Sequence, residues 1–196
     1  MALRKMFFLL ALLSFGSFVH AQVRNDAGAD LPLQWGKQNA KFQIEVFVDL
    51  QCPTCASYNE ILKSLEKKYS DQILLTIRHY PLPQHDKALL AAKMVEAAYR
   101  QHKGFEMLDM ILANQKAWTT DEKAQEIFFG YAKKLGLKME QFKQDFSSEQ
   151  TDLRIRQDVS RAKSLELTAT PSVLLDHKLL TYAEDLDIEA LITKTN

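Results

Sequence analysis

One junction in the sequence, VFVDLQCPTCASYNEIL, constrains the fold more than any other segment. It begins at residues 46–48, where a segment that first alternates becomes almost wholly apolar, as is typical of a strand buried on both faces. After it, apolar side chains recur at helical spacing, which predicts a helix from Pro53 to about Tyr69. Both cysteines of the chain, Cys52 and Cys55, lie where the strand gives way to the helix.

The order of the remaining patterns predicts the fold class. A second apolar run, QILLTIRHYPL, follows the helix and predicts a strand, and strand, helix and strand in this order predict a βαβ unit with parallel strands. Two short strands are predicted at 172–175 and 179–182, whereas His85 to about Leu167 is helical throughout. The two ends can share one sheet only if the helical block is an insertion. We therefore predict an α/β fold with an inserted all-helical domain.

Local signals place some ends of the smaller elements. Thr119 and Glu122 have the spacing of a capping box, which predicts the start of a helix that stops at Gly136. A later helix is predicted near 152–165, and a closing helix over about 186–193. Residues 22–41 look like a polar leading arm, with a short edge strand around residues 31–34.

The N-terminus has the features of a secretory signal peptide. Arg4 and Lys5 precede a mainly apolar run over 6–18, which is too short to span a bilayer, and small residues lead up to Ala21. We expect cleavage after residue 21 and export of a domain-sized chain. The leader takes two of the 25 basic residues with it and leaves 25 acidic ones, so nucleic acid is not an expected partner.

The two cysteines allow three interpretations. A structural disulfide between residues three apart removes little entropy from the unfolded chain, so it would stabilise the fold poorly. A zinc site needs four ligands, and the histidines that remain after the leader have no ligand-like spacing with one another. A reactive pair fits best, and in that case the chain needs no cofactor beyond the Cys52–Cys55 disulfide.

The spacing of the pair explains why it would be reactive. If Cys52 is the N-cap of the helix, Pro53 falls at the first helical position, where its missing N–H costs nothing. The free N–H groups of Thr54 and Cys55 then point at the Cys52 sulfur, and the helix dipole adds to their effect. We expect the pKa of Cys52 to lie well below the ordinary cysteine value, so that Cys52 is a thiolate, and we expect Cys55 to resolve the mixed disulfide.

Four segments together resemble the DsbA-like family of thiol:disulfide oxidoreductases. They are VFVDLQCPTC, RHYPLPQHDKALLAAKMVEAA, KGFEMLDMIL and TATPSVLL, in the family's order over nearly the whole mature chain. The resemblance implies a thioredoxin fold whose halves, 22–83 and 168–196, enclose a helical domain at 84–167. It also implies a cis peptide bond between Thr170 and Pro171, facing the cysteines and presenting backbone to substrate.

Three positions depart from the family's pattern. Many relatives carry a buried acid six residues before the first cysteine, but this chain has Val46 there, and Glu45 is predicted on the opposite face of the strand. The Pro53-Thr54 dipeptide lacks the histidine found in the strongest oxidants. We therefore expect a reduction potential between about −270 mV, as in thioredoxin, and about −120 mV, as in DsbA. The predicted hairpin LLDHKLL also lacks a glycine at its turn.

The leading hypothesis is an exported, monomeric dithiol oxidase in the periplasm or another extracytoplasmic space. By resemblance, its partners would be unfolded or folding exported proteins and a reoxidising membrane protein of the DsbB or vitamin K epoxide reductase type. A disulfide isomerase or reductase kept reduced in the same compartment is the alternative among enzymes. A copper(I) carrier using both thiolates, or a holdase whose thiols are incidental, is the alternative from another class. His79 and His85 are interpreted as structural residues.

Overall fold

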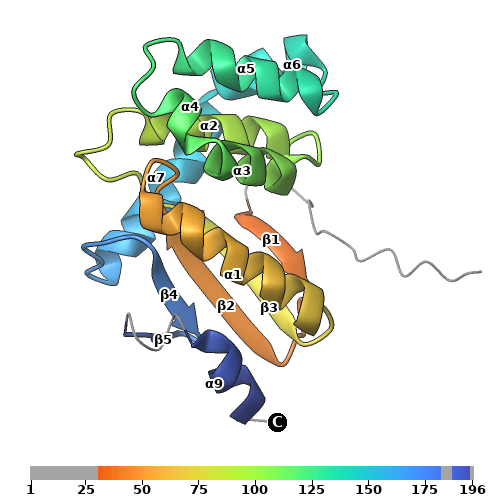
Figure 1. The fold of residues 1–196 in the computed structure, drawn as a ribbon, viewed down its shortest axis with the longest axis vertical. Helices are drawn as coiled ribbons and strands as arrows, with labels where there is room; N and C mark the ends of the chain where they lie inside the picture. The colour runs from red at the N-terminus through yellow and green to blue at the C-terminus, as the bar shows by residue number, and fades with distance from the viewer. Residues whose placement is uncertain (1–30, 182–186, 195–196) are drawn as a thin grey trace, which may run out of the picture.

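The computed structural model describes residues 31–181 and 187–194. A five-stranded sheet has the order β1-β3-β2-β4-β5 (Figure 1). Strand β2 runs parallel to β3, as the βαβ pattern predicts, and the other neighbours are antiparallel. The strands are β1 (Leu33–Gly36), β2 (Phe42–Val48), β3 (Ile73–His79), β4 (Ser172–Leu175) and β5 (Lys178–Leu179).

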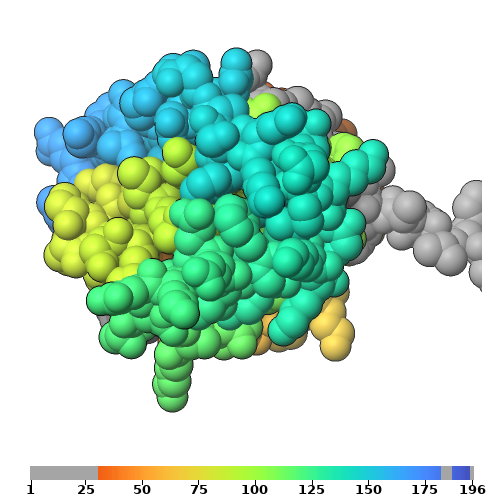
Figure 2. Space-filling model, turned by 90° about the horizontal axis from the view of Figure 1, so that it is seen from above, coloured from red at the N-terminus to blue at the C-terminus, as the bar shows by residue number. Residues whose placement is uncertain are grey.

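The helices divide into a group that packs on the sheet and a block inserted between β3 and β4. Helix α1 (Pro53–Tyr69) has the predicted bounds and lies across one face of the sheet (Figure 1). The closing helix is α9 (Ile188–Lys194). The inserted helices are α2 (Ala88–Tyr99), α3 (Gly104–Ala113), α4 (Gln115–Trp118), α5 (Ala124–Lys134), α6 (Met139–Phe146) and α7 (Glu149–Ser164). Seen from above, the molecular surface is formed mainly by this block (Figure 2).

Alternate residues of β2 face two different cores. Val46 and Val48 belong to the large apolar cluster that also contains residues of α1, α2, α3 and α5. Phe47 points to the other face, where it packs with Leu174 of β4 and Ala162 of α7. A strand with apolar side chains on both faces is buried on both, which is what the near-continuous apolar run predicts.

Two predicted helix starts are wrong. Thr119 and Glu122 do not form a capping box, because Thr119 is the C-cap of α4 and α5 begins at Ala124 after a turn. The reason is Trp118, which is fully buried and holds α4 as a separate short helix. Helix α7 begins at Glu149 rather than near residue 152, because the Ser148 hydroxyl caps it by accepting a hydrogen bond from Thr151 N at 3.2 Å.

The two ends of the sheet agree with the predicted strands within a few residues. The predicted edge strand is β1, displaced by two residues, and Gly136 follows α5 with a φ of 72°. The hairpin without glycine makes its turn with Asp176 and His177, whose φ values of 47° and 68° are both positive, as a type I′ turn requires. The predicted signal peptide and the end of the strand predicted at 179–182 lie outside the described residues.

Candidate active site

Cys52 is the N-cap of α1, where the sequence places it. Its φ and ψ of −71° and 123° are extended, and Pro53 is the first residue of the helix. Cys52 N donates a hydrogen bond to Asp49 O at 3.1 Å, and Cys55 N donates one to Cys52 O at 3.1 Å. This geometry turns the first N–H groups of the helix toward the cysteine side chain.

The cis Thr170–Pro171 bond brings the second predicted segment of the site to the first. Cys52 Sγ lies 3.4 Å from Thr170 O, across 118 residues of sequence, and donates a hydrogen bond to it while the thiol is protonated. The Thr170 hydroxyl is buried, and no partner among the described residues lies within hydrogen-bonding geometry of it. The structure thus brings together all six residues predicted for the site, which are Cys52, Pro53, Thr54, Cys55, Thr170 and Pro171.

The two thiols differ strongly in acidity. A hydrogen bond from the Cys55 thiol is the largest reason that the pKa of Cys52 falls from 9.0 to about 5. Burial opposes this change, whereas the N–H of Cys55, the Thr170 side chain and the N–H of Thr54 reinforce it. The pKa of Cys55 is raised by the same hydrogen bond, by burial and by the charge on Cys52. At neutral pH the site therefore holds one thiolate, at Cys52, and one thiol.

Exposure distinguishes the cysteines in the same direction. Both thiols are free in this structure, and 8% of the Cys52 surface is exposed against 1% for Cys55. The more accessible sulfur is thus also the more acidic one. An incoming thiol or disulfide can reach Cys52 first, while Cys55 meets only groups of the protein.

The position six residues before Cys52 carries no acid, as the sequence indicates. Val46 is fully buried and lies in register with Ile77 of β3. Glu45 points to the opposite face, where it pairs with Arg78 and with Arg161 of α7. Burial alone would raise the pKa of Glu45, but the hydrogen bonds from these two arginines hold it below its ordinary value.

Asp49 is a buried carboxylate that sequence reasoning missed. One of its oxygens accepts a hydrogen bond from Gln51 N at 2.8 Å, and the other accepts one from Leu82 N at 2.7 Å and lies 2.8 Å from His85 Nδ1. These contacts tie the loop before Cys52 to the loop after β3. The only sequence signal was an acid three residues before the first cysteine. The structural interpretation of His85 agrees with this contact.

Gln115 is the second side chain that sequence reasoning missed. Its Nε2 donates hydrogen bonds to Leu50 O at 2.8 Å and to Cys52 O at 2.9 Å. Gln115 begins α4 in the inserted block and lies more than 60 residues along the chain from both acceptors. A glutamine in a helical pattern carries no signal of such a contact, so only the tertiary structure reveals it.

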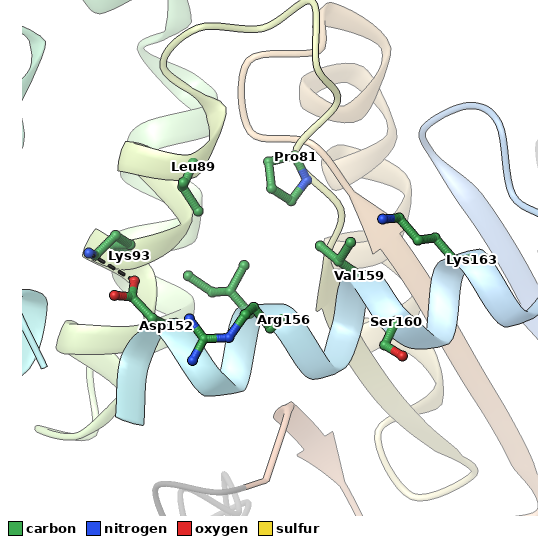
Figure 3. A pocket seen from close by; sticks show the side chains of 9 residues that line it. Pro81, Leu89, Lys93, Asp152, Arg156, Val159, Ser160 and Lys163 are labelled. Carbon is green, nitrogen blue, oxygen red and sulfur yellow. Dashed lines mark ion pairs between the residues drawn. The ribbon is translucent and has the colours of Figure 1, made fainter. Parts of the chain in front are cut away.

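A surface cavity of about 740 Å³ lies between the chain after β3, α2 and α7 (Figure 3). Leu89, Ile155 and Val159 form much of its apolar lining, and Lys93 at its edge is paired with Asp152 at 2.9 Å. Neither cysteine lines it. Elsewhere among the described residues, no cluster of three or more His, Cys, Asp or Glu is arranged to hold a metal ion. Nor does any helix of that part of the chain have the length and apolar character to span a membrane.

Curated relatives match this chain over most of its length. The probable disulfide bond formation protein D of Bacillus anthracis is 28% identical over 193 residues, which cover 91% of this chain and 88% of that protein. The Na(+)/H(+) antiporter NhaA of Herminiimonas arsenicoxydans is 29% identical over 150 residues, which cover 76% of this chain but 23% of the antiporter. The chain thus spans about a quarter of the length of the antiporter relatives.

Solved structures agree with this fold at low sequence identity. BdbD from Bacillus subtilis, in its oxidised form, has a TM-score of 0.73 at 20% identity, covering 84% of this chain and 92% of that one. Alpha-DsbA1 from Wolbachia pipientis has a TM-score of 0.70 at 20% identity, covering 82% and 88%. The family model described as thioredoxin matches residues 30–194. With its CxxC pair at the start of α1 and its helical insertion, the chain shares the fold of BdbD and alpha-DsbA1 and belongs to the thioredoxin family.

Proposed function

We propose that the chain is an oxidase that passes the Cys52–Cys55 disulfide to folding proteins. The observation that carries this proposal is the placement of the pair, with Cys52 at the N-terminus of α1 beside Thr170 and Cys55 buried in the first turn. This placement makes the acidity of the two thiols unequal, with a pKa of about 5 at Cys52 and a raised pKa at Cys55. The thiolate exists only in the reduced form of the pair. Its stabilisation therefore favours the reduced form and makes the disulfide a better oxidant.

The acidity of Cys52 suggests a reduction potential. A pKa of about 5 stabilises the reduced pair at pH 7 by roughly 3 kcal/mol relative to a protonated thiol, which corresponds to about 60 mV in a two-electron couple. Thioredoxin, whose first thiol has a pKa near 7, has a potential of about −270 mV. A thiol of pKa 7 is already half ionised at pH 7, so the difference from thioredoxin is about 50 mV, and we expect a potential of roughly −220 mV, between those of thioredoxin and DsbA.

The proposed reaction has two exchange steps. A substrate thiolate attacks Cys52 Sγ of the disulfide, the bond to Cys55 breaks, and Cys55 leaves and takes up a proton. A second substrate thiolate attacks the substrate sulfur of the mixed disulfide, and Cys52 leaves as a stable thiolate. The substrate loses two electrons and the cysteine pair gains them. Should a mixed disulfide stall, Cys55 resolves it by attacking Cys52 Sγ.

Thr170 and Pro171 are the proposed substrate-binding residues. They lie beside Cys52 at the start of β4, where backbone groups can pair with an extended substrate segment without reading its sequence. Pro53 and Thr54 are proposed to stabilise the thiolate through the helix N-terminus. The proposed substrates are exported proteins that are still folding.

The signal-like N-terminus supports an extracytoplasmic location for this work. A solved structure of similar fold is named as a periplasmic thioredoxin-like protein from Salmonella enterica, with a TM-score of 0.66. In that location the reduced pair must be reoxidised to act again. A membrane protein of the DsbB or vitamin K epoxide reductase type is the proposed electron acceptor.

The equilibrium constant of the pair with glutathione at pH 7 tests the direction of the reaction. A potential of roughly −220 mV is expected, and trapping of free thiols in cells should find the pair mainly oxidised. A value more negative than about −250 mV would replace the oxidase by a reductase. Exchange activity that survives Cys52→Ser would overturn the assignment of the nucleophile.

A further inference from the structure

We propose that Gln115 is a positioning residue that holds the backbone of Cys52 in its thiolate-stabilising geometry from within the inserted helical block. The inference rests on the proposed role of Cys52 as the attacking sulfur. It gives the insertion a part in the exchange reaction itself. All the other residues assigned to the reaction, the two cysteines and the Thr170–Pro171 segment among them, lie outside that block.

The contact is bidentate toward two nearby carbonyls. Gln115 Nε2 lies 2.8 Å from Leu50 O and 2.9 Å from Cys52 O, so its two hydrogens are directed to the carbonyls on either side of Gln51. Cys52 O also accepts the first hydrogen bond of α1, from Cys55 N at 3.1 Å. The amide of Gln115 thus fixes the peptide group through which the loop enters the helix.

The inserted block holds Gln115 firmly in place. Trp118 lies one turn later on α4, is fully buried, and donates from Nε1 to Ile111 O at 2.9 Å. Its ring packs edge-on against Phe128 of α5, with 5.0 Å between the ring centroids. On the other side of Gln115, Asn114 Nδ2 donates to Met110 O at 2.7 Å. The side chain of Gln115 is partly buried, which limits the access of solvent to its hydrogen bonds.

Two physical effects connect this clamp to the sulfur. The carbonyls of Leu50 and Cys52 carry partial negative charge beside a developing thiolate, and a donor on each reduces that charge. The clamp also holds Cys52 at a ψ of 123°, which turns the first N–H groups of α1 toward the side of Sγ without a hydrogen bond that closes the cap. Without the donors, Leu50 O loses the hydrogen bond from Gln115 and Cys52 O keeps only those from the first turn of α1, so the peptide groups around Gln51 are held less firmly relative to the sulfur.

The test is the thiolate titration of the reduced full-length chain with Gln115→Met, followed by the ultraviolet absorbance of the thiolate. Methionine keeps the length of the side chain but has no N–H donor. The pKa of Cys52 should rise by roughly half a unit to one unit, because the loss of the two donors disfavours the thiolate more than the neutral thiol. Gln115→Glu should raise it further, because a carboxylate would face two carbonyl oxygens.

Gln101→Met is the matched control. Gln101 also bonds one peptide group of the block, since Nε2 donates to Lys138 O at 3.2 Å and Oε1 accepts from Lys138 N at 2.8 Å. It lies between α2 and α3, and its hydrogen bonds within the described part of the chain go to Ala98 and Lys138 rather than to the loop of Cys52. The control should lose comparable stability and leave the pKa of Cys52 unchanged.

Three outcomes would overturn the inference. They are an unchanged pKa in Gln115→Met, an equal rise in Gln101→Met, and equal values for Gln115→Met and Gln115→Glu. If Gln115→Met does not fold, Gln115→Asn gives the same test, because its amide is one methylene too short to reach both carbonyls. The titration measures the pKa of Cys52, and this measurement is the same whether the pair acts as an oxidant or as a reductant. Failure of the oxidase proposal would therefore leave the test valid. If Cys52 were not the attacking sulfur, Cys52→Ser would instead retain exchange activity.

Discussion

At the scale of single residues, the site depends on two sulfurs one helical turn apart that experience opposite surroundings. Cys52 lies before the helix and receives N–H donors, whereas Cys55 lies inside the first turn and is almost fully buried. The same hydrogen bond that lowers the pKa of Cys52 raises that of Cys55. A short sequence motif thus sets both pKa shifts, because the positions relative to the helix start follow from the spacing alone.

The lowered pKa of Cys52 predicts a pH dependence of the relative stability of the two redox forms. The folded pKa lies near 5 and the ordinary value is 9.0, so ionisation contributes stability that is fully present above the ordinary value and is lost as pH falls through the folded one. Only the reduced form has this group. Its free energy of unfolding, relative to that of the oxidised form, should fall by about 2 kcal/mol between pH 7 and pH 5.

Urea unfolding of both redox forms at the two pH values measures this difference. Other titrating groups are common to both forms and largely cancel. Cys52→Ser, kept in reductant, is compared with the oxidised wild-type chain. The difference between their free energies of unfolding should stay constant from pH 7 to pH 5. A difference between the redox forms that stays constant from pH 7 to pH 5 would mean that Cys52 is not ionised in the folded protein.

The parts of the site that the sequence pattern itself predicted are the local ones, whereas Thr170 and Pro171 were predicted through the family resemblance. Cys52, Pro53, Thr54 and Cys55 are four successive positions of one segment, and their places relative to the helix start can be counted directly. Asp49 and Gln115 act through partners far along the chain, Leu82 in one case and the loop of Cys52 in the other. No periodicity encodes such a pairing, which exists only once the sheet and the helical block are assembled.

At the scale of elements, α7 joins the inserted block to the sheet through a buried network of charges. Asp158 of α7 has a fully buried side chain, pairs with Arg78 of β3 at 2.8 Å and with Arg154, and accepts a hydrogen bond from His79 N at 3.0 Å. Glu45 of β2 extends the network to Arg78. These contacts fix the helix against the strands that carry the site.

Asp158→Asn tests how much this network contributes. Asparagine keeps the shape and an acceptor but removes the negative charge between two arginines, so the free energy of unfolding should fall by about 3 kcal/mol or more. Arg156→Gln on the same helix breaks an exposed pair with Glu149 and should change it by less than about 1 kcal/mol. Urea unfolding at pH 7 compares them. Equal small losses would mean that the network adds no stability.

The element boundaries show where sequence patterns suffice. Helix α1 and the parallel strands β2 and β3 were predicted because each has a clear period and a clear end. The starts of α5 and α7 were not, because Trp118 and Ser148 decide them through burial and a cap rather than through periodicity. The turn at Asp176 and His177 forms without glycine, so its type could not be predicted from the usual residues.

At the scale of the whole molecule, the sheet and the inserted block share one core. Leu33 and Val46 of the sheet belong to the same apolar cluster as Phe105, Ile111 and Phe128 of the helices. The network on α7 and the Gln115 clamp join the same two parts at other places. An insertion that shares its core with its host has no independent interior, so the two should fold and unfold as one unit.

The two tryptophans of the chain provide a direct test, because each lies in a different part. Trp35 is on β1 of the sheet and Trp118 is on α4 of the block, and both are buried. In Trp35→Phe and Trp118→Phe, the remaining tryptophan reports one part alone. Within each variant, the fluorescence midpoint in urea should coincide with the midpoint of far-ultraviolet circular dichroism, because a two-state transition looks the same to every probe. If Trp118 fluorescence instead changed at a separate denaturant concentration, the block would be an autonomous domain, and the shared core would not couple it to the site.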